Sequence, residues 1–322
     1  MTSVQRARGQ RAHGQRARGG RARLLGAGGV LAASALAAAA CGSSSDAGAV
    51  TSGGDTVSVV ASTNVYGDIA RQIGGDKVEV TSFISDPAQD PHSFEAGTRT
   101  RLAVSKAAVV IENGGGYDDF VGTLLKGSGS KAEVLNAVRI SGKTAPEGEE
   151  LNEHVWYDLP SAALLADRLS AALAKADPGD AGTYSANAAA FKTRLKALEG
   201  KVAALKTAHS GDGVAITEPV PVYLLEAAGL RNRTPGAFSE AIEEGGDVPP
   251  RALQETLALL KEKKVEALVF NAQTSGPQTE RLKKAAEDAG VPVVPVTETL
   301  PEGQDYITWM DGTIAALQKA LS

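Results

Sequence analysis

Hydrophobic residues after position 56 form short β-branched runs that alternate with longer stretches in which apolar residues recur at helical spacing. The runs that predict strands are residues 57–61, 78–83, 107–111, 213–216, 266–270 and 292–295. Helical patterns separate them near residues 65–73, 98–105, 117–126, 161–175, 219–228, 250–263, 277–288 and 304–321. Strands that alternate with helices predict parallel sheets in an α/β fold.

One stretch in the middle departs from this alternation. Between residues 178 and 209, five apolar residues from Phe191 to Leu205 recur at helical spacing. A helix of about 25 residues would span roughly 37 Å. Because α/β patterns precede and follow it, we expect it to join two lobes; one more surface helix of a single domain is the alternative. The expected organisation is an N-terminal α/β lobe at 56–178, a rigid linking helix at 179–210 and a C-terminal α/β lobe at 211–322.

The first 41 residues have the layout of a secretory signal: seven arginines, no acid, and then a short Ala- and Gly-rich apolar run. Cys41, the single cysteine, follows three alanines and precedes Gly42, which resembles a bacterial lipobox. There the cysteine sulfur is lipidated and the chain is cut just before it. An ordinary signal with a chance cysteine is the alternative. We expect an exported protein anchored through Cys41 on the outer face of the cell membrane, with residues 42–55 as a flexible tether.

Charge excludes one class of partner. Of the 33 basic side chains, seven lie in the first 40 residues, which leaves 26 basic against 38 acidic side chains and a net charge of about −12. Nucleic-acid binding needs a basic footprint, so we expect no nucleic-acid partner. An acidic body is compatible with a cation as the ligand.

Three histidines remain after the signal. His92 lies in "DPHSFE" between Pro91 and Ser93, and His154 lies in "NEHVWYDLP". Both have carboxylates nearby, and imidazole is the commonest protein metal ligand. His209 ends the long helix, where a cation complements the helix dipole, so we interpret it as structural.

A third candidate ligand is Glu218, which follows the strand predicted at 213–216. Ligands of open α/β sheets bind outside the carboxyl ends of the strands. An acid that begins the next helix and is favoured by its dipole explains Glu218 equally well.

At this point the residues carry a family resemblance. "VSVVASTNVYGDIARQIGGDKVEVTSFISDPAQDPHSFE" resembles the opening of the zinc/manganese receptors of bacterial ABC importers, the cluster A-I solute-binding proteins. "NEHVWYDLP" is similar to the family's "NPHVWLDP", with Glu153 in place of the proline. "YSANAAAFKTRL" and "VYLLEAAGL" resemble later family segments, so the resemblance runs from about residue 56 to the end.

The resemblance implies two lobes joined by one long helix, with one divalent metal ion, Zn²⁺ or Mn²⁺, bound between them as the transported ligand. It maps the first two metal ligands onto His92 and His154 and the third onto Glu218, where manganese receptors of the family also carry glutamate. An ABC permease with its ATPase would be the partner, and the protein would be a monomer.

The family's fourth ligand, an acid, has no clear match in the loop "VFNAQTSGPQTE", where Thr274 or Ser275 occupies the expected place. A carbonyl oxygen of Asn271 or Gln273, the Ser275 hydroxyl or water would complete the set. The acidic segment at 239–247 could also supply a carboxylate, but its alternation of acidic and other residues is more typical of a solvated turn.

A metal-dependent hydrolase with the same His-His-Glu site is the alternative function. The sequence contains no H-E-x-x-H motif, no Ser-His-Asp pattern and no phosphate-binding glycine loop. A sugar or peptide receptor would rely on aromatic platforms, and two Trp and six Tyr are few for that purpose. We therefore expect a transport receptor and not an enzyme.

Overall fold

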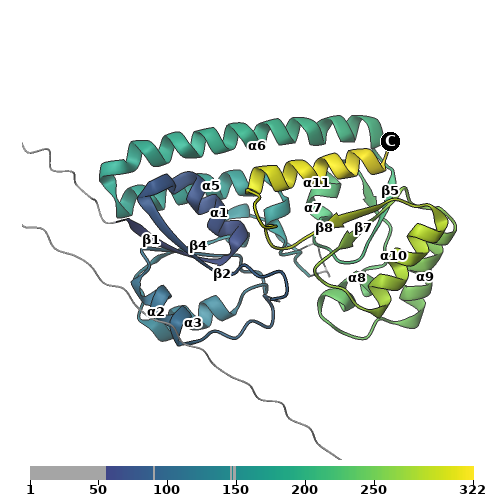
Figure 1. The fold of residues 1–322 in the computed structure, drawn as a ribbon, viewed down its shortest axis with the longest axis horizontal. Helices are drawn as coiled ribbons and strands as arrows, with labels where there is room; N and C mark the ends of the chain where they lie inside the picture. Colours follow the sequence, from purple (N-terminus) through teal and green to yellow (C-terminus); the bar gives the residue numbers. More distant parts are fainter. Residues whose placement is uncertain (1–55, 90, 146, 148–149) are drawn as a thin grey trace, which may run out of the picture. The chain divides into compact units, whose positions relative to one another are not determined.

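The computed structural model describes residues 56–89, 91–145, 147 and 150–322. The predicted signal with Cys41, the tether at 42–55 and Asp90 lie outside the described residues. Within them, eight strands form two parallel four-stranded sheets flanked by helices (Figure 1). This confirms the predicted α/β fold with two lobes, each built on one sheet.

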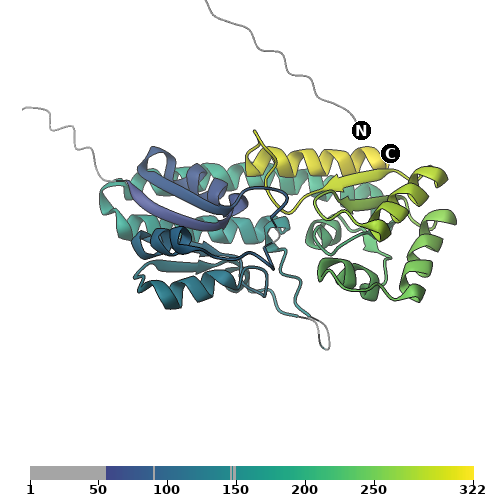
Figure 2. The ribbon, with the colours of Figure 1, turned by 60° about the horizontal axis from the view of Figure 1, so that its bottom comes forward.

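The first sheet has the strand order β2-β1-β3-β4. Its strands are β1 (Val57–Thr63), β2 (Val78–Ile84), β3 (Val109–Glu112) and β4 (Glu133–Asn136). Central β1 is apolar on both faces, because helices cover the sheet on both sides. The helices between these strands are α1 (Asn64–Gly74), α2 (Thr98–Lys106) and α3 (Phe120–Ser128), followed by α4 (Ala137–Ser141) and α5 (Leu159–Ala176). Figure 2 shows α2 and α3 away from α1, consistent with their separate core cluster.

The second sheet repeats this layout with the order β6-β5-β7-β8. Its strands are β5 (Gly213–Ile216), β6 (Arg231–Asn232), β7 (Ala267–Asn271) and β8 (Val293–Val296). The associated helices are α7 (Val222–Ala227), α8 (Gly236–Glu243), α9 (Pro250–Lys261), α10 (Pro277–Ala289) and α11 (Tyr306–Ala320). Helices α8, α9 and α10 cover one face of the sheet, and α7 and α11 contribute to the core on the other.

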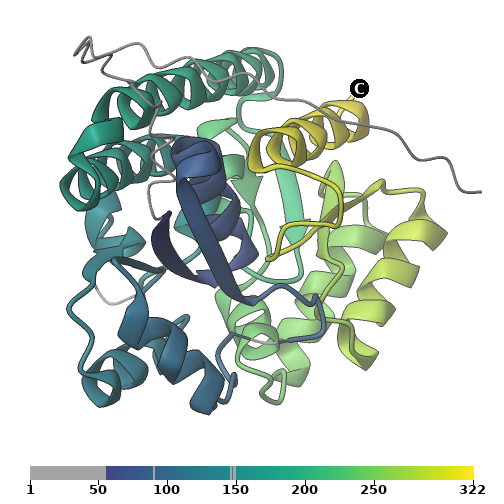
Figure 3. The same ribbon diagram turned by 60° about the vertical axis from the view of Figure 1, so that its left-hand side comes forward.

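Helix α6 (Ala181–His209) is the predicted long helix and runs for 29 residues. Its buried side is the apolar stripe read from the sequence, from Phe191 to Leu205. Figures 1 and 3 show α6 with α11 alongside it. One continuous hydrophobic cluster contains residues of α6 and of both sheets, such as Val59 of β1 and Val269 of β7. The exact lobe boundaries at 178 and 211 stay a prediction.

The segment after β8 is hydrogen-bonded to the first lobe. Asn64 Nδ2 donates to the carbonyl of Leu300, and the Leu300 N–H donates back to Asn64 Oδ1, both at 2.9 Å. Tyr157 Oη donates to the Thr297 carbonyl at 2.7 Å. The residues that lead away from β8 are therefore fixed against the first lobe at the edge where the sheets end.

Four strands and α-helices were missed by the sequence patterns: β4, β6, α4 and α8. Strand β4 is a four-residue edge strand with a single buried side chain, and β6 has two exposed residues, so neither carries a hydrophobic run. Helix α8 occupies the acidic segment predicted to be a solvated turn, and that prediction is wrong. None of the described helices is long and apolar enough to cross a membrane.

Candidate metal centre

A cleft of about 920 Å³ lies where the loops of the two sheets meet. Several lining residues follow the carboxyl ends of parallel strands, namely Glu218 after β5, Gln273 after β7 and Glu298 after β8. This is the edge at which α/β sheets bind ligands. The described lining contains seven glutamates and no lysine or arginine, so its chemistry favours a cation.

His92 enters the cleft from the loop after β2. Its Nε2 lies 3.7 Å from Glu153 Oε1, and one third of its side chain is exposed. The ring packs edge-on against Tyr117, with 5.2 Å between ring centroids. The predicted ligand is thus placed by an aromatic contact and has its Nε2 turned toward a carboxylate.

His154 is buried, with 1% of its surface exposed. It precedes a short 3-10 turn (Val155–Tyr157), after which the Asp158 side chain caps α5 by accepting from the Ser161 N–H at 3.0 Å. The sequence "HVWYD" therefore holds the histidine at the start of a fixed turn. Its ring packs 5.0 Å from that of Trp156.

The hydrogen bonds around His154 define which ring nitrogen faces the cleft. Asn152 Nδ2 donates to the Pro219 carbonyl at 3.0 Å, which turns Asn152 Oδ1 toward His154 Nδ1 at 2.8 Å. Because that oxygen only accepts, Nδ1 carries the proton and Nε2 has the free lone pair. Burial, with a contribution from His92, lowers the pKa of His154 to about 3. The imidazole is thus a neutral donor, the form that binds metals.

Glu218 follows β5 and is 2% exposed. The side-chain amide of Asn271 donates to Glu218 Oε2 and, at 2.8 Å, to Glu298 Oε1. The Asn271 Oδ1 atom accepts from the Gln273 N–H at 3.1 Å. Asn271 therefore bridges two carboxylates as a donor, and its oxygen is engaged by the Gln273 N–H.

The other predicted fourth ligands have partners elsewhere. Gln273 Oε1 accepts from the backbone N–H groups of Glu298 and Thr299, and Ser275 Oγ donates to Glu280 at 2.9 Å.

The acid in the expected part of the cleft is instead Glu298, which the sequence reading missed. It follows the end of β8 by two residues, as Glu218 follows the end of β5. Tyr117 Oη donates to Glu298 Oε2 at 3.2 Å. A glutamate two residues after the end of a strand is therefore the sequence signal that would have identified Glu298.

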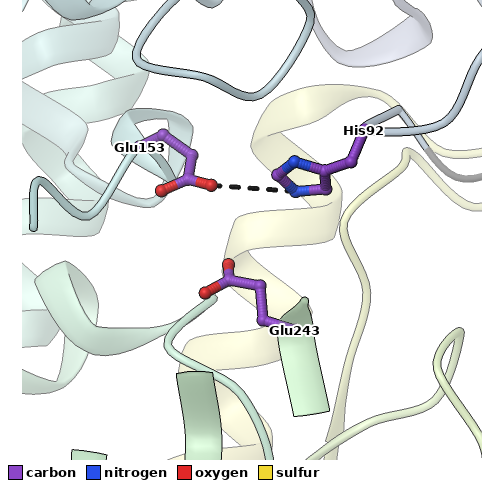
Figure 4. Close-up of side chains that lie close together, drawn as sticks. All are labelled: His92, Glu153 and Glu243. Atoms are coloured by element: carbon purple, nitrogen blue, oxygen red, sulfur yellow. Dashed lines mark ion pairs between the residues drawn. The ribbon is translucent and has the colours of Figure 1, made fainter. Parts of the chain in front are cut away.

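Two further carboxylates enter the same space. One ligand atom each of His92, Glu153 and Glu243 lie within 4.8 Å of one another, and Figure 4 shows the three side chains pointing toward a common centre. Glu243 Oε1 also lies 3.2 Å from His154 Nε2. Burial, then repulsion from Glu153, Glu218 and Glu298, raises the pKa of Glu243 to about 9. Burial also raises the pKa of Glu153, although its own backbone and His92 oppose this.

The structure thus brings His92, His154 and Glu218 to one cleft and adds Glu153, Glu243 and Glu298. Two imidazoles and several carboxylates, crowded without a lysine or arginine among the described lining residues, form a donor set for a divalent cation.

Comparison with known proteins also points to proteins that bind metal ions. Residues 59–320 match the family described as "Zinc-uptake complex component A periplasmic". The manganese-binding lipoprotein MntA of Bacillus subtilis is 26% identical over 265 residues, which cover 78% of this chain and 81% of that protein. The iron ABC transporter substrate-binding lipoprotein MtsA of Streptococcus pyogenes serotype M1 is 24% identical over 263 residues, or 77% of this chain and 82% of that protein.

Among solved structures, the periplasmic zinc-binding protein TroA from Treponema pallidum superposes with a TM-score of 0.69. The match covers 83% of this chain and 99% of that chain at 17% sequence identity, which shows a shared fold. The names of the three similar proteins carry three different metals.

Proposed function

The chain belongs to the family of periplasmic A components of zinc-uptake complexes, and on this premise we propose that it captures one divalent transition-metal cation in the cleft between its lobes. It then delivers the cation to a membrane permease powered by an ATPase. Members of this family are solute-binding proteins of ABC importers and not enzymes, so the hydrolase alternative is set aside.

The observation that carries the proposal is that His92, Glu218 and Glu298 line one cleft from both lobes. The buried His154 directs its Nε2 at Glu243, which lines the same cleft. His154 presents the lone pair of Nε2, and Asn271 holds Glu218 and Glu298 side by side. We assign as ligands His92, His154, Glu218 and Glu298. The set replaces the predicted amide or hydroxyl at the fourth position with a carboxylate.

The cation is Zn²⁺ or Mn²⁺. Nitrogen donors suit Zn²⁺, while carboxylate oxygens suit harder cations such as Mn²⁺. Intrinsic affinity at mixed nitrogen and oxygen sites favours Zn²⁺, so the ion carried in the cell also depends on which metal is available.

The proposal also covers the way the protein is held at the membrane. The residues around Cys41 fit a lipidated cysteine, and the similar proteins of Bacillus subtilis and Streptococcus pyogenes are named lipoproteins. A protein anchored in this way would work as a monomer beside its permease. Cys41→Ser in the expressed full-length chain would release the protein from the membrane fraction, and retention there would contradict the anchor.

Titration with metal tests the proposed capture. The purified protein, stripped of metal with a chelator, is titrated with Mn²⁺ and separately with Zn²⁺ by calorimetry, and native mass spectrometry counts the bound ions. One ion per chain is expected, with binding that a chelator reverses. Absence of binding for both cations would overturn the proposed function.

A further inference from the structure

We propose that Glu243, the last residue of α8, is an additional ligand of the captured cation and favours Mn²⁺ over Zn²⁺. The inference rests on the proposed function, because it adds one residue to the same cation site. Nothing in the family resemblance assigns a ligand to this helix.

The packing of α8 places Glu243 at the cleft. Phe238 and Ile242, four residues apart, are buried in the core of the second lobe. This anchors the helix, and Glu243 follows Ile242 directly at its C-terminal end. The Glu243 side chain lines the cleft and is 15% exposed, whereas the next residue, Glu244, is exposed. Glu243 is therefore held inside by a fixed helix and not by a solvated turn.

The pair formed by His154 and Glu243 points to a cation. His154 Nδ1–H donates a hydrogen bond to Asn152 Oδ1, so the Nε2 atom that faces Glu243 Oε1 at 3.2 Å carries a lone pair. Glu243 Oε1 is buried and makes no hydrogen bond to the described residues. Two lone pairs face each other across 3.2 Å. Such a contact is stabilised by a positive charge that both atoms share, either a proton or a metal ion.

The distance itself suits two ligands of one metal ion. Donor atoms bonded at about 2.1 Å and separated by roughly 90–109° lie about 3.0–3.4 Å apart. The His154–Glu243 distance falls within this range, and the donor atom of His92 lies within 4.8 Å of that of Glu243. Small adjustments of these side chains would bring all three donors to one ion.

The surroundings of Glu243 favour a metal ion over a proton as the lasting partner. The carboxyl groups of Glu153, Glu218 and Glu298 are all close enough to Glu243 to repel its negative charge, and the described lining offers no lysine or arginine to compensate. One divalent cation neutralises two of these charges at once, whereas a proton on Glu243 neutralises none of the other three.

An additional carboxylate changes the preference of the site. It adds an oxygen to His92, His154, Glu218 and Glu298 and brings the number of protein ligands to five. Zn²⁺ prefers four ligands, while larger and harder cations accept more oxygens. Glu243 should therefore strengthen the binding of Mn²⁺ more than that of Zn²⁺.

The test is Glu243→Gln, with Glu287→Gln on the exposed face of α10 as the matched control that removes the same charge outside the cleft. The glutamine amide can still donate a hydrogen bond to His154 Nε2, so the variant keeps the contact that a protonated Glu243 would make. We expect the Mn²⁺ dissociation constant to rise roughly ten- to hundredfold in Glu243→Gln and the Zn²⁺ constant to rise less. Glu287→Gln should leave both within about threefold of the wild type, since an exposed charge outside the cleft is screened.

Loading the protein with Co²⁺ in place of Mn²⁺ or Zn²⁺ reports on the coordination of the ion. A change in long-range electrostatics alone would not alter its absorption bands. The visible absorption bands of bound Co²⁺ should change in Glu243→Gln and stay unchanged in Glu287→Gln. Wild-type affinity for Mn²⁺ in Glu243→Gln would overturn the inference while the wild-type titration upholds the proposed function. Tighter binding in Glu243→Gln would also overturn it, because Glu243 would then be a competitor of the cation. A wild-type protein that binds no cation would overturn the proposed function and this inference together.

Discussion

The two lobes contribute different chemistry to one cleft. The first lobe supplies both imidazoles, His92 and His154, together with the carboxylate of Glu153. The second lobe supplies carboxylates alone, those of Glu218, Glu243 and Glu298. No histidine occurs after residue 209, so the second lobe has no imidazole to offer. Nitrogen donors bind most transition metals well, whereas the proportion of oxygen donors shifts the preference among them. We therefore expect the first lobe to govern whether a cation is bound, and the second to govern which cation is preferred.

The largest effect is expected when the first lobe loses a nitrogen donor. His154→Ala removes the neutral Nε2 donor and leaves Glu243 without its neighbour. Loss of groups that only orient a ligand costs about 10–100-fold in affinity, so loss of a ligand should weaken Mn²⁺ and Zn²⁺ binding by at least about a hundredfold. Calorimetry or competition with a chelating dye measures this. His209→Ala, at the end of α6, is the control and should bind normally; a matching loss there would contradict the assignment.

A nitrogen donor placed in the second lobe should reduce the difference in donor chemistry between the lobes. Glu218→His exchanges a carboxylate for an imidazole at the end of β5, and we expect the ratio of Zn²⁺ to Mn²⁺ affinity to rise about tenfold. Glu226→His introduces the same side chain on the exposed face of α7 and is the control. An unchanged ratio in Glu218→His would remove Glu218 from the ligand set.

A third change removes the group that holds the two oxygen donors together. Asn271→Ala deletes the amide between Glu218 and Glu298, so a buried and a half-buried carboxylate lose a shared hydrogen-bond donor. We expect the free energy of unfolding of the metal-free protein to fall by about 1–3 kcal/mol. Saturating Mn²⁺ should restore part of it, because the cation attracts both carboxylates in place of the lost hydrogen-bond donor. Denaturant titration with and without Mn²⁺ measures the difference, and an identical loss in both would contradict this role.

The smallest effect is expected at a contact between the lobes that touches no ligand. Tyr157→Phe removes the hydrogen bond to the Thr297 carbonyl, at a cost of about 1 kcal/mol in the free energy of unfolding. Mn²⁺ affinity should stay within about threefold of the wild type. A large loss of affinity would show that this contact, and not the donor set alone, determines binding.

Much of the fold could be predicted because the central strands are buried on both faces. Val59 and Val60, with opposite orientations in β1, are both inaccessible to solvent, so the strand appears in the sequence as a continuous apolar run. The 29-residue α6 was equally visible through its buried stripe. Strands β4 and β6 gave no such signal, because their pairing comes from backbone hydrogen bonds to neighbouring strands and not from buried side chains.

The site was predictable to a different degree in each lobe. His92 and His154 stood out because histidine is rare in this chain, whereas glutamate is common and its individual members are hard to distinguish. Glu298 was missed because the fourth ligand was expected in the loop after β7, although β8 ends at the same edge of the sheet. Glu243 belongs to the acidic segment that could supply a carboxylate but was interpreted as a solvated turn. The structure buries Phe238 and Ile242, at helical spacing, on one face of that segment's helix.

The continuous hydrophobic cluster that passes from β1 through α6 to β7 has a thermodynamic consequence. Two lobes with separate cores would melt in separate steps, but here a loss of packing in one lobe exposes apolar surface that belongs to the other. Heating should therefore produce one calorimetric transition, with its van't Hoff enthalpy equal to its calorimetric enthalpy. A cation that binds only the native state should then raise the melting temperature of the entire unit. At a free concentration of 100 times the dissociation constant, it adds about 2.7 kcal/mol to the free energy of unfolding.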